Sequence, residues 1–135
     1  MTACFADSFY FLALLNPADA AHAVAARVAK ELRRPLVTTA WVLTEVADAM
    51  AAPPNRPLFL KLIAGLRALP SVEIVPASSE LFDRGIELYA RRPDKSWSLT
   101  DCLSFVVMTE RGLTDALTGD HHFEQAGFRA LLRRT

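Results

Sequence analysis

Short apolar runs alternate with longer segments of helical periodicity along this chain. Five runs have the length and composition of buried strands, and they cover residues 2–6, 35–38, 72–75, 116–118 and 128–132. The segments between them are expected to form helices over residues 8–15, 18–32, 40–50, 58–69, 78–90 and 98–112. This alternation predicts an α/β fold with a central, mainly parallel sheet of about four to five strands, covered by helices on both faces.

The helix expected at residues 98–112 is apolar nearly all round, so it should lie at the centre of the fold. Ser98 and Asp101 have the spacing of a capping box at its start. The segments 53–57 and 91–97 contain prolines and break the helical pattern, which predicts two loops.

Length and charge limit the possible classes of protein. The chain has 135 residues, of which 52% are hydrophobic, and this suits one globular domain spanning residues 1–135. Fifteen basic and 15 acidic residues give a formal net charge of zero. No overall basic excess indicates binding to nucleic acid, so any such surface must be local.

Cysteine usage and the N-terminal segment predict a cytoplasmic protein. Cys4 and Cys102 lie in apolar surroundings without the spacing of a metal site, and they suit buried thiols in a reducing compartment. The apolar run at residues 9–15 has no preceding Lys or Arg and therefore differs from a secretory signal. No run approaches the roughly 18 apolar residues of a membrane-spanning helix, so no membrane association is expected.

Four acidic residues occupy positions where an element is expected to begin or end, or where the neighbours are apolar. Asp7 and Asp120 follow predicted strands, Asp101 lies in the first turn of the central helix, and Glu45 lies on the apolar helix at residues 40–50. Ligands of parallel sheets bind at the carboxyl ends of the strands, so the four side chains are expected to converge. Because buried carboxylates need a partner, this convergence predicts a site for a hard divalent cation.

Each acid also has an ordinary structural interpretation. Asp7 and Asp101 could cap helices, Glu45 could be an exposed helical residue, and Asp120 could be a turn residue. We favour the metal site for the first three, with capping and ligation compatible at Asp101, and leave both interpretations open for Asp120. Asp115 should lie at the opposite end of its strand and is therefore excluded from the site.

Four segments, in order along nearly the whole chain, resemble the motifs of the PIN domain, the metal-dependent ribonuclease fold of VapC-type toxins. They are Phe5-Ala6-Asp7-Ser8, Thr44-Glu45, Ser98-Leu99-Thr100-Asp101-Cys102-Leu103-Ser104-Phe105 and Leu117-Thr118-Gly119-Asp120-His121-His122-Phe123. Each motif alone has little specificity, whereas the ordered set in a chain of this length is fairly specific.

The resemblance implies a three-layer α/β/α sandwich and an endoribonuclease that uses Mg²⁺ or Mn²⁺ on single-stranded or looped RNA. Carried over to this chain, it makes Asp7 and Asp101 the inner metal ligands, with Glu45 and Asp120 binding directly or through water. It also implies a cognate antitoxin protein as a partner and a homodimer.

Other side chains could support such a site. Ser8 and Thr118 could position a ligand or water, or could satisfy the local backbone. Lys95, close to two arginines, could follow RNA phosphates. Trp97 could stack on a base, although we favour a role in the core. The pair His121–His122 is expected to form a turn at the rim of the site, with the two rings pointing apart.

Two alternatives belong to other functional classes. One is a PIN-like module that binds RNA or protein without catalysis, and four retained acids argue against it. The other is an α/β phosphohydrolase with Asp7 as nucleophile. That class usually has a second Asp two residues later, where this chain has Phe9.

Overall fold

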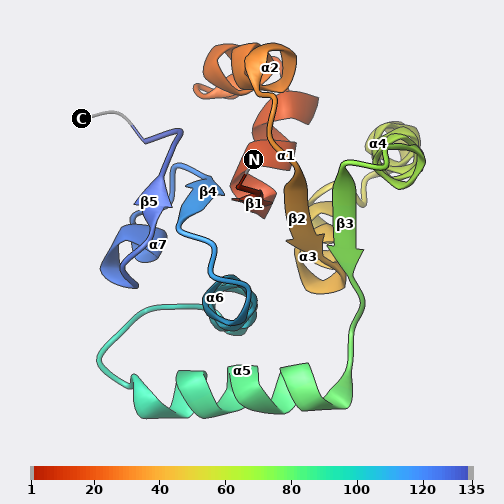
Figure 1. The fold of residues 1–135 in the computed structure, drawn as a ribbon. Helices are drawn as coiled ribbons and strands as arrows, with labels where there is room; N and C mark the ends of the chain where they lie inside the picture. The colour runs from red at the N-terminus through yellow and green to blue at the C-terminus, as the bar shows by residue number, and fades with distance from the viewer. Residues whose placement is uncertain (1, 134–135) are drawn as a thin grey trace.

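The structure, a computed structural model, describes residues 2–133 and contains a five-stranded sheet. The strands are β1 (Cys4–Ala6), β2 (Leu36–Thr39), β3 (Val72–Val75), β4 (Asp115–Leu117) and β5 (Arg129–Ala130). Their order is β3-β2-β1-β4-β5, and every neighbouring pair is parallel (Figure 1). The predicted parallel sheet is therefore confirmed.

Helices cover both faces of this sheet and confirm the expected three-layer α/β/α sandwich. They are α1 (Ser8–Leu15), α2 (His22–Glu31), α3 (Ala40–Ala49), the 3₁₀ helix η1 (Pro53–Asn55), α4 (Arg56–Ala68), α5 (Ser79–Arg91), α6 (Leu99–Glu110) and α7 (His121–Gln125). Helix α6 lies between α5 and the sheet (Figure 1).

Helix α6 is buried on nearly every side, as its sequence predicts, because α5 packs against it closely. Its buried residues include Leu103, Phe105 and Met108. A side chain at Gly85 of α5 would bring a Cβ within 2.5 Å of Leu103 Cδ2, so glycine permits this approach. The tight packing fixes the start of α6, which carries Asp101.

Two helix boundaries differ from the prediction. Helix α2 begins at His22 rather than at residue 18, because Asn16 and Asp19 side chains accept hydrogen bonds from the backbone two residues on. Such local hydrogen bonds occupy backbone N–H groups and so compete with the hydrogen bonds of a helix. Helix α4 begins at Arg56, and Pro57 lies in its first turn, where its missing N–H has no helical partner to lose.

Helix α7 replaces the turn expected at residues 121 and 122. The Asp120 carboxylate accepts a hydrogen bond from the backbone of His122 and caps the helix. Gly127 follows it with a φ of 96°, a conformation that favours glycine after a helix. The five-residue helix is too short to show helical periodicity in the sequence.

Both cysteines are buried free thiols, as expected, and burial raises the pKa of Cys4 and of Cys102. Within residues 2–133, none of the helices has the length and apolar character needed to cross a membrane.

Candidate active site

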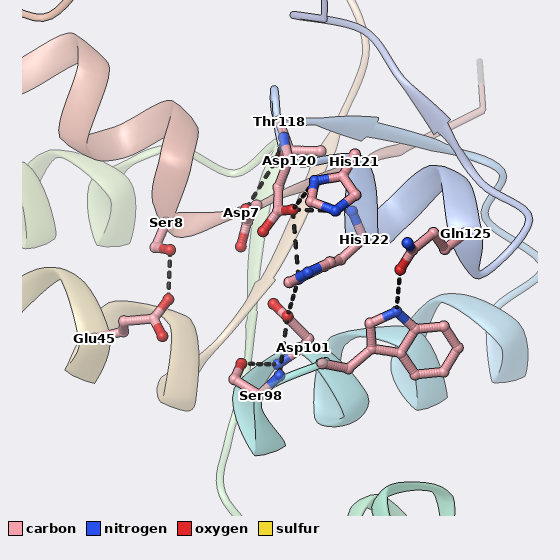
Figure 2. A network of polar contacts seen from close by, with 11 residues as sticks. Asp7, Ser8, Glu45, Ser98, Asp101, Thr118, Asp120, His121, His122 and Gln125 are labelled. Carbon is pink, nitrogen blue, oxygen red and sulfur yellow. Dashed lines mark hydrogen bonds and ion pairs between the residues drawn. The ribbon is translucent and has the colours of Figure 1, made fainter. Parts of the chain in front are cut away.

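The carboxyl ends of β1 and β4 lie side by side and form one side of an acidic cleft. Ala6 pairs with Leu117, so Asp7 follows the end of β1 next to the end of β4. Asp120 lies three residues after β4. Helix α6 brings Asp101 and α3 brings Glu45, and all four acids line a cavity of about 390 Å³ (Figure 2). The structure thus brings the four predicted acids together.

Asp7 is the most buried of the four acids, with 5% of its surface exposed. Its side chain makes no capping hydrogen bond with α1, so the structure does not support the capping alternative. Instead, the Thr118 hydroxyl donates to Asp7 Oδ2 over 2.8 Å. Burial raises the pKa of Asp7 to about 7, the Thr118 hydrogen bond opposes this, and the negative charge of Asp101 adds to it.

Asp101 caps its helix and also lines the acidic cleft. Ser98 and Asp101 form the predicted capping box, in which Asp101 Oδ2 accepts from the Ser98 backbone over 3.1 Å. The same oxygen lies 3.1 Å from His122 Nδ1. Burial raises the pKa of Asp101, and these contacts oppose the shift. The cap thereby fixes the carboxylate in the cleft.

Thr118 joins the two strand-end acids. Its hydroxyl donates to Asp7 and accepts from the backbone N–H of Asp120 over 3.1 Å. Asp120 caps α7 rather than lying in a simple turn, and it also lines the cleft. On the other side of the cleft, the Ser8 hydroxyl donates to Glu45 Oε1. Both predicted hydroxyl residues therefore contact acids of the cleft (Figure 2).

The expectation that the adjacent histidines point apart is wrong. The ring centroids of His121 and His122 lie 4.5 Å apart, and their Nδ1 atoms lie 3.7 and 3.5 Å from Asp120 Oδ1 (Figure 2). Helical Cα–Cβ bonds tilt toward the N-terminus, so side chains in the first turn lean back over the capping residue. His122 therefore lines the cleft itself, whereas the sequence placed the histidine pair only at its rim.

Trp97 occupies the core, as favoured from the sequence. Its side chain is nearly buried, its Nε1 donates to Gln125 Oε1 over 3.0 Å, and its ring packs edge-on against Phe105. Trp97 and Lys95 line a second cavity of about 530 Å³. Ser96 lines both this cavity and the acidic cleft, so the basic loop lies beside the acids.

Asp115 lies away from the cleft, which agrees with its exclusion. It begins β4, and its carboxylate binds Arg129 over 3.1 Å and Arg34 over 2.9 Å. These arginines hold the pKa of Asp115 below its usual value, with Arg129 making the larger contribution.

The family model of the PIN domain matches residues 4–129. The chain belongs to the PIN-domain family. The sequence-based assignment to this family is confirmed, together with the fold that the family implies.

Individual relatives of this PIN domain agree with that assignment. It is similar to the 23S rRNA-specific endonuclease VapC20 from two strains of Mycobacterium tuberculosis. Each is 28% identical over 127 residues, which cover 92% of this chain and 94% of the relative. The similarity therefore extends over nearly the full length of both proteins.

Solved structures give the same result. A crystal structure of Mycobacterium tuberculosis VapC20, described as a sarcin–ricin loop cleaving toxin, superposes with a TM-score of 0.84 and 26% identity. It covers 93% of this chain and 95% of the other. FitAcB from Neisseria gonorrhoeae covers 94% of each chain with a TM-score of 0.64 and 20% identity, which shows a shared fold.

Proposed function

We propose that this PIN domain is an endoribonuclease that hydrolyses phosphodiester bonds of single-stranded or looped RNA, as the toxin of a toxin–antitoxin pair. The observation that carries the proposal is the convergence of Asp7, Glu45, Asp101 and Asp120 in one cleft. The full-length similarity to VapC20 endonucleases supports the reaction class. A VapC-like toxin acts on cellular RNA, so the site of action would be the cytoplasm.

The residues of the cleft fit a divalent cation. The raised pKa values of Asp7 and Asp101 arise because burial removes water from carboxylates that no lysine or arginine of the cleft neutralises. Carboxylate oxygens are the ligands of Mg²⁺ and Mn²⁺. We assign Asp7 and Asp101 as direct ligands, with Glu45 and Asp120 binding directly or through water. When bound, such a metal lowers the pKa of a water molecule and offsets charge on the phosphate.

Neighbouring polar groups hold the acids in position for this role. Thr118 donates to one oxygen of Asp7, and Ser8 donates to one oxygen of Glu45. The backbone of Ser98 donates to Asp101 Oδ2. Each contact fixes a carboxylate through one oxygen, so the second oxygen of each remains available for a cation. The site is therefore organised before metal or RNA binds.

The basic loop beside the cleft is proposed to bind the RNA backbone. Arg92 and Lys95 line the neighbouring cavity, and Arg92 lies over the Trp97 ring at 5.1 Å. Phosphates that flank the cleaved bond would reach these cations while the bond itself lies among the acids. Trp97 supports Arg92 from the core rather than stacking on a base.

Three further properties are proposed from the relationship to VapC proteins. The first RNA to test is 23S rRNA, because the similar VapC20 proteins are specific for it. A small cognate antitoxin would neutralise the enzyme, and the enzyme would form a homodimer.

The test is cleavage of 23S rRNA and of a mixed RNA pool by the purified protein with Mg²⁺, with Mn²⁺ and with EDTA. The Asp7→Asn and Asp101→Asn variants should lose about 1000-fold or more in rate, because each loses a ligand charge. Asp48→Asn is the matched control, since Asp48 is an exposed acid on the same helix as Glu45. Circular dichroism establishes that every variant is folded.

The outcome also separates the alternatives. Metal-independent cutting, or cutting that survives both substitutions, would reject the acidic site. RNA binding without cutting under all conditions would favour the silent module, which the similarity to endonucleases does not favour. Covalent phosphorylation of Asp7 would instead indicate the phosphohydrolase class.

A further inference from the structure

We infer that Asp120, His121 and His122 form a binding site for a divalent cation that prefers imidazole ligands, such as Zn²⁺ or Co²⁺, at the rim of the acidic cleft. One ligand atom from each side chain lies within 4.8 Å of the other two. Both imidazole rings turn toward the Asp120 carboxylate (Figure 2). This site shares Asp120 with the cleft of four carboxylates and adds two imidazole nitrogens, and to that extent it rests on the proposed function.

The spacing of the donor atoms suits a tetrahedral ion. The Nδ1 atoms of His121 and His122 lie 3.7 and 3.5 Å from Asp120 Oδ1. Bonds of about 2.0–2.1 Å to a tetrahedral Zn²⁺ place neighbouring donors about 3.4 Å apart. Small rotations of the three side chains would therefore bring the donor atoms to the spacing of a tetrahedral ion. An octahedral Mg²⁺ requires neighbouring donors about 2.9 Å apart and prefers oxygen, so it fits less well.

The donor set points to the same class of metal. Two imidazoles and one carboxylate are a set found in zinc sites that keep a position open for water or another ligand. Nitrogen donors favour Zn²⁺, Co²⁺ and Ni²⁺, whereas carboxylates alone favour Mg²⁺ and Mn²⁺. The histidine pair therefore gives this end of the cleft a selectivity that the four acids do not have.

The protein holds these side chains in place without an ion. Asp120 caps α7 through the backbone of His122, and its own backbone donates to Thr118. His122 Nδ1 lies 3.1 Å from Asp101 Oδ2, so Asp101, which the proposed function assigns to the nuclease metal, is also within reach as a fourth ligand. His121 is exposed, which leaves a route from solvent to the site.

The test is titration of the purified, metal-free protein with Co²⁺, followed by visible absorption. We expect the strong absorption of a tetrahedral complex to reach its maximum at one equivalent of Co²⁺ bound to the histidine site. His121→Gln and His122→Gln should lose this absorption and weaken Co²⁺ binding by about tenfold or more, because losing a direct ligand costs at least as much as losing an outer-shell partner. Zn²⁺ should displace the Co²⁺, and millimolar Mg²⁺ should not.

Two control variants make the result specific. His22→Gln changes the histidine of α2, which contacts Ala13 outside the cleft, and should leave the spectrum unchanged. Asp7→Asn removes a proposed nuclease ligand and should also leave it unchanged, so failure of the nuclease proposal and failure of this site are distinguishable. Absence of tetrahedral absorption in the wild type, its retention in the His121 and His122 variants, its loss in either control, or displacement by Mg²⁺ would overturn the assignment.

Discussion

The two ends of strand β4 carry acids with opposite electrostatic surroundings. At its start, Asp115 binds Arg34 and Arg129, and its pKa is lowered. Beyond its other end, Asp7 and Asp120 share a cleft that no lysine or arginine among residues 2–133 lines, and the pKa of Asp7 is raised. An acid that the chain neutralises itself stabilises the fold, whereas an acid left without a basic partner takes up either a proton or a cation from solution.

The largest expected difference between the two ends is in catalysis. Asp101→Asn should reduce the RNA cleavage rate about 1000-fold, equivalent to about 4 kcal/mol, while Asp115→Asn should retain nearly the wild-type rate wherever it is folded. Initial rates at 25 °C, with the folded fraction measured on the same samples, check this. Equal losses in the two variants would show that folding, and not the position of the acid, determines the rate.

The second expected difference is in the pH dependence of stability without metal. The folded-state pKa of Asp7 is about 7, above its ordinary value of 3.8, so the folded state holds an extra proton between these values. Stability should therefore fall by about 2–3 kcal/mol as pH rises from 5 to 8 in EDTA. Urea denaturation at each pH measures the free energy of unfolding.

Two comparisons sharpen that experiment. Asp7→Asn should remove most of the pH dependence, and Mn²⁺ at pH 8 should restore stability to the wild type. A wild-type stability that stays constant or rises over this range would contradict the view of Asp7 as a buried, uncompensated acid.

A smaller effect on stability is expected when the ion pairs of Asp115 at the start of β4 are removed. Asp115→Asn should lower the free energy of unfolding by about 1–3 kcal/mol, because it leaves Arg34 without its carboxylate partner. The value is modest since Arg129 is 72% exposed and solvent screens its charge. Asp94→Asn, at an exposed acid paired with Arg92, is the control and should leave the free energy of unfolding nearly unchanged.

The smallest predicted effect concerns the cap that positions Asp101. Ser98→Ala should cost about 1 kcal/mol of stability and reduce cleavage a fewfold, because the capping box is lost. Ser78→Ala removes the matching cap of α5, where Ser78 Oγ accepts from Leu81, and should cost similar stability without affecting cleavage. Equal rates in the two variants would mean that the cap does not position Asp101.

The sheet and the convergence of acids followed from the sequence because they depend on simple rules. Buried parallel strands are short apolar runs, and their carboxyl ends meet at one edge of the sheet. The same rule placed Asp7 beside the end of β4 and excluded Asp115 from the site. The capping box at Ser98 was visible because its spacing is local.

Other features were not accessible because they depend on distant contacts or on very short elements. The direction of the His121 and His122 rings depends on a five-residue helix and its cap. The partner of the Trp97 indole is Gln125, 28 residues away in sequence. The start of α2 is decided by competition between side-chain and helical hydrogen bonds at Asn16 and Asp19.

The hydrogen bond between Thr118 and Asp7 spans 111 positions of the chain. Its formation requires β4 to pair with β1, so the bond cannot form before β4 has been made. A growing chain therefore carries Asp7 and Glu45 well before it can close the cleft. The acidic cleft is therefore complete only after residue 120 has been made and β4 has paired with β1.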